Sequence, residues 1–393
     1  MIDYEDWIFE ELKIYKSKYS KTPFFISSWD CDSDLVVYPN KIISQSSEIA
    51  KDEFHYKFSE DLEFTKETLK NYYCTSNRDW HLNNFSLGIN STNSIYLALS
   101  ALIKKGKKRF LLVTPIYYSI IDTLLDFSRD ITFFHLRDLD EFRFDSDRIE
   151  QIVKQQYIEV IIFSDPVYCA GLEIGTEIYE RIVKISNAYK VTVFIDGTLG
   201  GLEWRNDADI FFSREKTNII KESYDFFLIN SGPKLFFLND LKFSVVISLA
   251  DNIALIEDLS SQISGGLNKI QVNLFRLFYA ESARNELYAC KSQNISTIRN
   301  NYNLLSASLI GTDWQLYPTN SGYFTMLVSK KVLLGEVDPI DVTKKLLYGH
   351  NLLPIMGNYF SFFQDNKVSI RINLMKNLRG HLPALTEALN MDI

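Results

Sequence analysis

Lys234 is the residue of this chain whose position points most clearly to chemistry. It follows the small-residue turn Ser231-Gly232-Pro233 and stands between two apolar runs, residues 224–231 and 243–249, that are typical of buried strands. A lysine held between buried strands loses part of its hydration, which lowers the pKa of the amine and makes it nucleophilic. Such an amine can form a Schiff base with a carbonyl compound. Taken alone, the segment also fits an ordinary lysine in a surface turn, and the rest of the chain favours the first interpretation.

Other side chains able to do chemistry follow further apolar runs. Asp196 closes the run VTVFID and precedes a glycine-rich turn, an arrangement that surface solvation explains poorly. Ser91 and Thr92 begin a helical pattern, where hydroxyls and free backbone N–H groups suit a phosphate, with a simple helix cap as the alternative. Two more runs end close to Tyr117 and Tyr168, whose rings fit either a ligand site or the core.

The elements that must position these residues alternate between strands and helices. Apolar runs without alternation predict strands at 109–115, 131–136, 159–166, 191–196, 224–231 and 243–249. Helical spacing predicts helices at 91–105, 119–128, 145–156 and 177–190. This order predicts an α/β fold with a mostly parallel central sheet and helices on both faces. Ligands of such sheets bind at the carboxyl ends of the strands, where the candidate residues stand.

The pattern changes after about residue 252. A long helical stretch over residues 263–309, broken only at Gly265 and Gly266, precedes strands at 322–329 and 367–375 and helices at 338–349 and near 380–391. These elements predict a smaller α+β domain that the N-terminal residues join. The predicted boundaries are 50–275 for the large cofactor-binding domain, and 1–49 with 276–393 for the small domain.

Composition excludes several classes of function. The 393 residues carry a net charge of −8, which argues against a nucleic-acid or anionic-membrane partner. The N-terminus is an acidic amphipathic pattern, so neither a secretion signal nor a membrane span is predicted. Four cysteines and five histidines lack the spacing of a metal site, which predicts reduced thiols, a cytoplasmic location and no metal.

Together, these residues resemble the fold-type I pyridoxal-phosphate enzymes, specifically the class I/II aminotransferase family, over about residues 50 to 380. The resemblance implies pyridoxal 5'-phosphate as the cofactor, with Asp196 paired to its pyridine nitrogen and Lys234 holding it as an aldimine. It also implies that Ser91 and Thr92 (in NSTNSI) and Lys242 (in DLKFS) bind the phosphate, and that Tyr56 reaches the phosphate of the neighbouring subunit. Tyr117 would stack on the ring with Tyr168 beside it, and Ser231 would open the Ser-x-x-Lys element. Arg371 (in VSIRINL) would bind the substrate carboxylate.

The chain departs from the family pattern at several positions. Tyr168 stands where an asparagine usually bonds the phenolic oxygen of the cofactor, and Leu199 stands where a tyrosine is usual. Lys242 replaces an arginine, which keeps the charge but loses the bidentate fork. The usual glycine-rich substrate segment is absent, and Trp29 stands there with three acids, Asp30, Asp32 and Asp34. These acids fit either a basic substrate side chain or a solvated loop.

The resemblance implies an enzyme that acts on an α-amino acid, a small-molecule substrate, through an external aldimine and a quinonoid carbanion. We expect an aminotransferase, and the departures suggest specialised biosynthesis. A pyridoxal-phosphate-dependent lyase, cyclase or oxidase is the alternative. A cofactor-free binding protein is a third hypothesis, against which Lys234 and Asp196 both speak. The resemblance further implies a homodimer whose active site lies at the subunit interface.

Overall fold

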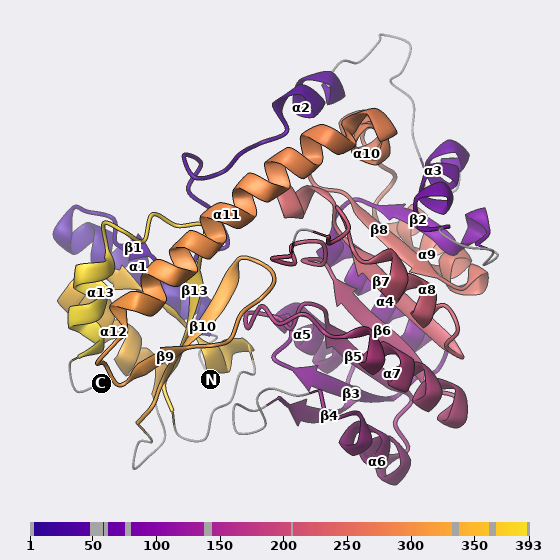
Figure 1. Cartoon of the computed structure of the whole chain (residues 1–393). Coiled ribbons are helices and arrows are strands. Elements are labelled where there is room, and N and C mark those ends of the chain that lie inside the picture. Colours follow the sequence, from indigo (N-terminus) through magenta and orange to yellow (C-terminus); the bar gives the residue numbers. More distant parts are fainter. Residues whose placement is uncertain are drawn as a thin grey trace.

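The computed structural model describes most of the chain in two lobes (Figure 1). The described residues are 4–47, 58, 62–74, 80–136, 144–205, 207–331, 338–360 and 367–390.

A seven-stranded sheet forms the larger lobe. Its strands lie in the order β2 (Phe85–Gly88), β8 (Ser244–Ser248), β7 (Asp225–Asn230), β6 (Thr192–Gly197), β5 (Val160–Ser164), β3 (Arg109–Thr114) and β4 (Asp130–His135). Strand β8 runs antiparallel to both neighbours, and the other pairs are parallel. The predicted mostly parallel sheet is therefore confirmed. Strand β2 was not predicted, because four residues are too few to show a period.

Helices cover both faces of this sheet. Alternate residues of each strand point to opposite faces, so Val160 and Ile162 of β5 join one core cluster while Ile161 and Phe163 join the other. The first cluster packs under α4 (Ser91–Lys104), α5 (Tyr118–Asp126) and α9 (Ala250–Ile263). The second packs under α6 (Ser146–Gln156), α7 (Thr176–Tyr189), α8 (Arg214–Ile220) and α10 (Lys269–Tyr279). Helix α3 (Glu63–Tyr73) and the short turn η3 (Leu82–Asn84) lie beside β2.

The smaller lobe contains an antiparallel sheet. Its strands lie in the order β12 (Ile355–Met356), β13 (Ser369–Asn373), β10 (Phe324–Ser329) and β9 (Trp314–Leu316). A second pairing, β1 (Phe24–Phe25) with β11 (Leu352–Leu353), joins the N-terminal part of the chain to the C-terminal part. The helices of this lobe are α1 (Tyr4–Tyr19), α12 (Pro339–His350) and α13 (Leu382–Leu389), with the short turn η7 (Gly357–Phe360).

Helix α11 (Arg284–Ser308) runs diagonally from the top of the larger lobe to the smaller one, and α2 (Asn40–Ser46) packs beside α10 (Figure 1). The predicted break at Gly265 and Gly266 is present, and both glycines have positive φ. The prediction of one helical stretch from there onward is wrong, because Ala280 adopts an extended conformation and the turn η6 (Glu281–Ala283) separates α10 from α11. No glycine or proline marks this second break.

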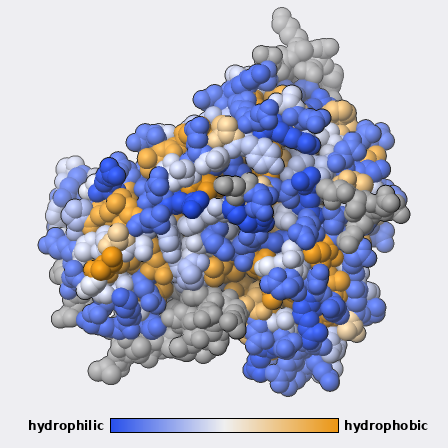
Figure 2. Space-filling view, viewed as in Figure 1, coloured by the Kyte–Doolittle hydropathy of each residue, from blue (hydrophilic) through white to orange (hydrophobic). Residues whose placement is uncertain are grey.

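Hydrophilic residues dominate the face shown in Figure 2, with hydrophobic residues in small groups among them. Within the described ranges, no helix combines the length and the apolar character that crossing a membrane requires.

Candidate active site

Lys234 lies in a tight turn at the end of a buried strand. The turn η5 (Pro233–Phe236) follows β7 directly, and the Ser231 hydroxyl donates to the Phe243 carbonyl at 3.1 Å, which ties the turn to the start of β8. A Cβ added at Gly232 would meet the rings of Phe211 and Phe243 at 3.2 Å, so a small residue suits this position. The local sequence therefore holds Lys234 against the sheet and directs it into a cavity.

The environment of Lys234 favours a neutral amine. The pKa of Lys234 is lowered to about 8: burial is the main cause, the like charge of Lys242 adds to it, and Asp196 opposes both. A neutral amine is the nucleophilic form, so the lysine is prepared to attack a carbonyl carbon near neutral pH.

We expect the pH dependence of cofactor capture to report this pKa. Below pH 8 the rate at which Lys234 captures added pyridoxal phosphate should rise about tenfold per pH unit, because the neutral fraction rises by that factor, and above pH 8 it should level off. Stopped-flow absorbance measures this rate. In Lys242→Met, loss of the neighbouring positive charge should move the profile to higher pH. A wild-type profile that still rises steeply well above pH 8 would contradict the prediction.

Asp196 lies at the end of β6, the strand next to β7. It is 5% exposed, and its carboxylate accepts the Thr198 main-chain N–H at 3.1 Å. Burial raises the pKa of Asp196 above its ordinary value, while Thr198 and the Lys234 charge oppose this. A buried carboxylate of this kind gains from a cationic partner, and it lines the same cavity as Lys234.

This cavity, called here the ring cavity, gathers residues from several strand ends. Six residues named from the sequence line it: Ser91, Thr92, Tyr117, Tyr168, Asp196 and Lys234. The other lining residues are Trp29, Ile95, Ser164, Pro166, Thr198, Leu199 and Phe324. Leu199 is a wall residue, as its place in the sequence pattern suggests. Most of the wall is aromatic or aliphatic, which suits a flat ring.

A second cavity adjoins the first at the N-terminus of α4. It shares Ser91, Thr92 and Lys234 with the ring cavity, and it adds Ser231 and Lys242 among other residues. The side chain of Asn90 caps α4 by accepting the Asn93 N–H at 2.8 Å. Hydroxyls, the positive end of a helix and a lysine amine together form a donor set that suits a phosphate.

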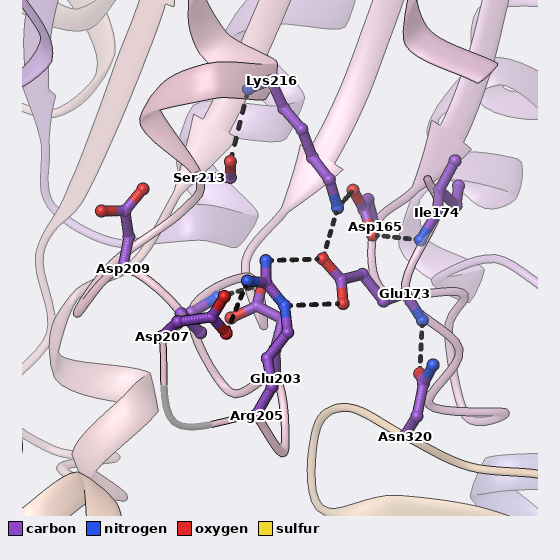
Figure 3. Close-up of polar contacts among 12 residues, drawn as sticks. Asp165, Glu173, Ile174, Glu203, Arg205, Asp207, Asp209, Ser213, Lys216 and Asn320 are labelled. Atoms are coloured by element: carbon purple, nitrogen blue, oxygen red, sulfur yellow. Dashed lines mark hydrogen bonds and ion pairs between the residues drawn. The ribbon is translucent and has the colours of Figure 1, made fainter. Parts of the chain in front are cut away.

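A buried ion-pair network supports the turn that carries Tyr168 (Figure 3). Lys216 of α8 contacts Asp165 at 2.9 Å and Glu173 at 3.2 Å, at the two ends of this turn. Asp165 also accepts the Tyr179 hydroxyl at 2.7 Å. Arg205 pairs with Glu173 at 3.1 Å on the outer side of the network. Burial lowers the pKa of Lys216, but its two acidic partners raise it more, so its ammonium form is stabilised.

Lys216→Met is expected to destabilise the fold by about 3–5 kcal/mol, because it leaves the buried Asp165 carboxylate without its cation. Urea unfolding followed by circular dichroism measures the change in the free energy of unfolding. The matched control is Lys184→Met on the exposed face of α7, where we expect less than about 0.5 kcal/mol. Equal effects at the two positions would show that the buried pairing is not important.

The same turn joins the two lobes. The N–H groups of Asn320 and Ser321 both donate to the Gly171 carbonyl at 2.9 Å, and the Thr319 hydroxyl donates to the Ala170 carbonyl at 2.7 Å. Gly171 has φ +64°, and a Cβ there would lie 2.4 Å from the Ser321 carbonyl oxygen, so glycine is required. The Tyr168 turn is thus held from the larger lobe by Lys216 and from the smaller lobe by residues 319–321.

Arg371 lies near the ring cavity but not on its surface. It belongs to β13, is fully buried, and donates from Nη2 to the Ser27 carbonyl. Trp29 and Phe324, which do line the cavity, lie against its guanidinium. Arg371 therefore lies close to the ring cavity, but Trp29 and Phe324 line the cavity in its place.

Two further sequence predictions concern Tyr56 and the acids after Trp29. Tyr56 lies outside the described residues. Asp32 accepts from Lys376 Nζ and from the Asn377 N–H, each at 2.7 Å, so it anchors the loop after β1 to the end of β13. Asp30 and Asp34 are exposed, and none of the three acids is among the described lining residues of the ring cavity.

Sequence reasoning missed Phe324 and gave Trp29 no role in the cavity wall. Phe324 carries no local signal, because it belongs to an ordinary apolar strand of the smaller lobe. Trp29 was visible as a departure from a glycine-rich segment, and that departure is the signal that could have identified it.

The sheet with one antiparallel strand, the smaller lobe, and the lysine and aspartate at neighbouring strand ends are features of the fold-type I pyridoxal-phosphate enzymes. A model of the family described as aminotransferase class I and II matches residues 63–379, and the chain belongs to this family. It is accordingly a pyridoxal-phosphate-dependent enzyme of the aminotransferase type. No curated protein matches the chain in a sequence comparison.

Solved structures show the same fold at low sequence identity. The aspartate aminotransferase of Thermus thermophilus with maleate has a TM-score of 0.81 and 12% identity, covering 97% of this chain and 95% of that one. The aspartate aminotransferase of Rhizobium meliloti has a TM-score of 0.81 and 13% identity, covering 99% and 96%. YbdL of Escherichia coli, described as having a methionine aminotransferase function, has a TM-score of 0.76 and 14% identity, covering 98% and 97%.

The residues present fit the cofactor of this family. The ring cavity offers a buried carboxylate whose pKa is raised by burial and a lysine whose pKa is lowered. The adjoining cavity offers the phosphate donor set at the N-terminus of α4.

Proposed function

We propose that this protein is an aminotransferase that removes the amino group of an α-amino acid and delivers it to a keto acid. One observation carries the proposal: Lys234 and Asp196 line the same cavity, and a phosphate-type donor set adjoins it. Pyridoxal phosphate, when bound, supplies a carbonyl carbon and an electron-withdrawing ring. The chain supplies the groups that hold this cofactor and move the protons.

Lys234 takes the covalent role in the proposal. Its Nζ would hold the cofactor at the carbonyl carbon, with release of water, and as a free amine it would carry a proton from the substrate Cα. Its lowered pKa suits it to accept that proton as a neutral amine near neutral pH. Asp196 keeps a proton on the ring nitrogen, since its buried carboxylate is stabilised by a positive charge.

The other residues orient the cofactor. Ser91, Thr92, Ser231 and Lys242 hold the phosphate, with looser geometry at Lys242 than an arginine would give. Tyr117 would stack on the cofactor ring, and its own ring centre lies 5.7 Å from that of Tyr168. Tyr168 would face the phenolic oxygen in place of the usual asparagine, a role supported by its position in the wall of the ring cavity.

Arg371 is the proposed ligand of the substrate carboxylate, because a guanidinium binds a carboxylate through two parallel hydrogen bonds. The names of the structural neighbours, aspartate and methionine aminotransferases, support an amino acid substrate. Specialised biosynthesis is our proposal for the pathway, supported by the departures at Tyr168 and Leu199.

A lyase, cyclase or oxidase acting on an amino acid is the alternative. Leu199 favours this alternative, because it lines the cavity where the family usually has a tyrosine and offers no hydroxyl to the cofactor oxygen. A site with fewer hydrogen-bond donors at that position suits a reaction other than transamination.

Incubation with single amino acids and no keto acid separates the two functions. An aminotransferase should release one equivalent of keto acid per active site and stop, while its visible absorbance band is lost. Multiple turnovers with release of ammonia, a cyclised amino acid or hydrogen peroxide would refute transamination and support the alternative. Mass spectrometry of the products provides the measurement.

We also propose a homodimer in which Tyr56 of one subunit reaches the phosphate site of the other. Tyr96 supports a covered surface there, because this aromatic side chain is 39% exposed beside the phosphate cavity. Light scattering coupled to size-exclusion chromatography tests the dimer. We also propose a cytoplasmic location. It is supported by the four cysteines, all free thiols: Cys31, Cys74, Cys169 and Cys290. The domain boundaries at residues 50 and 275 stay predictions.

A further inference from the structure

Arg371 is enclosed by two aromatic rings. Its guanidinium carbon lies 4.1 Å from the ring centre of Trp29 and 4.4 Å from that of Phe324. Its side chain is fully buried, and Nη2 donates to the Ser27 carbonyl. Guanidinium groups bind well to aromatic faces, particularly when both are removed from water. Arg371 is therefore already occupied by neighbours from its own chain.

Trp29 stands between this guanidinium and the ring cavity. It is half-buried and lines the cavity together with Phe324, whereas Arg371 does not line it. A carboxylate inside the cavity thus meets the indole ring before it can reach the guanidinium.

Trp29 also contacts the other side of the site. Burial raises the pKa of Tyr168, and a hydrogen-bonding interaction with Trp29 opposes this, in which the indole N–H can only donate to the Tyr168 oxygen. Trp29 therefore contacts both Arg371, which is proposed to bind the substrate carboxylate, and Tyr168, which is proposed to face the cofactor oxygen.

The backbone around Trp29 is fixed. Asn373 Nδ2 donates to the Ser28 carbonyl at 2.8 Å and to the Asp30 carbonyl at 3.1 Å. The Asp32 N–H donates to the Met375 carbonyl at 2.9 Å. The loop cannot swing away without losing these bonds, so the movement left to Trp29 is rotation of its side chain.

We propose that Trp29 is a specificity-determining residue that controls access of the substrate carboxylate to Arg371. This inference rests on the proposed function, in which Arg371 binds that carboxylate. In the free enzyme the indole covers the guanidinium. A substrate must displace it, and displacement also breaks the bond to Tyr168. Carboxylates that bind Arg371 weakly are therefore disfavoured, because they have to displace the Trp29 indole from the guanidinium.

The test measures binding of propionate, a carboxylate without an amine, to the cofactor-loaded enzyme by calorimetry. Trp29→Ala should bind propionate about tenfold tighter than wild type, because the competing indole is gone. Trp29→Phe should stay within about threefold of wild type, since its ring still covers the guanidinium. Trp29→Leu fills the space without an aromatic face and should gain as Trp29→Ala does, which keeps the test available if the alanine variant folds poorly.

Arg371→Ala identifies the ligand. Added to Trp29→Ala, it should abolish the gain in propionate binding, and a gain that persists overturns the proposal. No gain in folded Trp29→Ala or Trp29→Leu, or an equal gain in Trp29→Phe, also overturns it. Retention of the visible cofactor band in these variants shows that the Lys234 site is intact, so the control by Trp29 can fail while the proposed aminotransferase stands. Loss of covalent capture by wild-type Lys234 would instead refute the proposed function.

Discussion

Replacing Lys234 by alanine is expected to abolish covalent capture of pyridoxal phosphate and to lower the turnover rate by at least about a thousandfold. The variant loses both the amine that binds the cofactor carbonyl and the group that carries the proton from the substrate Cα. Borohydride reduction followed by peptide mass mapping measures the capture, and the wild-type protein should carry the cofactor on the peptide that contains Lys234.

The matched control is Lys242→Ala, which removes the neighbouring lysine of the phosphate cavity. It should bind the cofactor more weakly, yet still carry it on Lys234 after reduction. A reduced cofactor found on another lysine, or an unchanged visible band in Lys234→Ala, would refute the assignment of the site.

Asp196→Asn is expected to lower the turnover rate by about a hundredfold or more while covalent capture persists. An amide cannot hold a proton on a ring nitrogen as a carboxylate does, so the ring withdraws electrons less effectively. Burial makes the effect large, because Asp196 is 5% exposed and water cannot replace the lost charge. Steady-state kinetics and the dissociation constant of the cofactor are the measurements.

Asp207→Asn is a suitable control for Asp196→Asn. Asp207 is an exposed acid paired with Arg205 outside the ring cavity, and its loss should change turnover by less than about twofold. Similar losses in the two variants would mean that Asp196 acts through general stability and not through the ring nitrogen. If Asp196→Glu keeps much more activity than Asp196→Asn, the negative charge itself is the important property.

The parts of the fold that the sequence predicts are those with a strong local period. Strands β3 and β5 to β8 are continuous apolar runs, and the polar residues after the parallel strands β3, β5, β6 and β7 mark the edge where the ring cavity lies. Lys234 and Asp196 were predicted as site residues for this reason. The break at Ala280 was missed because no glycine or proline marks the point where the backbone becomes extended.

The parts of the site that the sequence could not give are contacts between distant segments. Phe324 reaches the ring cavity only because the smaller lobe packs against the strand ends of the larger one. The separation of Arg371 from the cavity likewise depends on Trp29, which lies at the other end of the chain. A motif identifies a residue type at a strand position, but it does not say which side chain will cover it.

The hydrogen bonds between residues 319–321 and the Gly171 turn have a mechanical consequence. They fix the smaller lobe to the larger one at the turn that bears Tyr168, so any rotation of one lobe on the other has to pivot about this point or break it. Displacements should then be smallest beside Tyr168 and grow toward the far ends of α12 and α13. Spin labels on those helices and near residue 320 would measure this gradient directly.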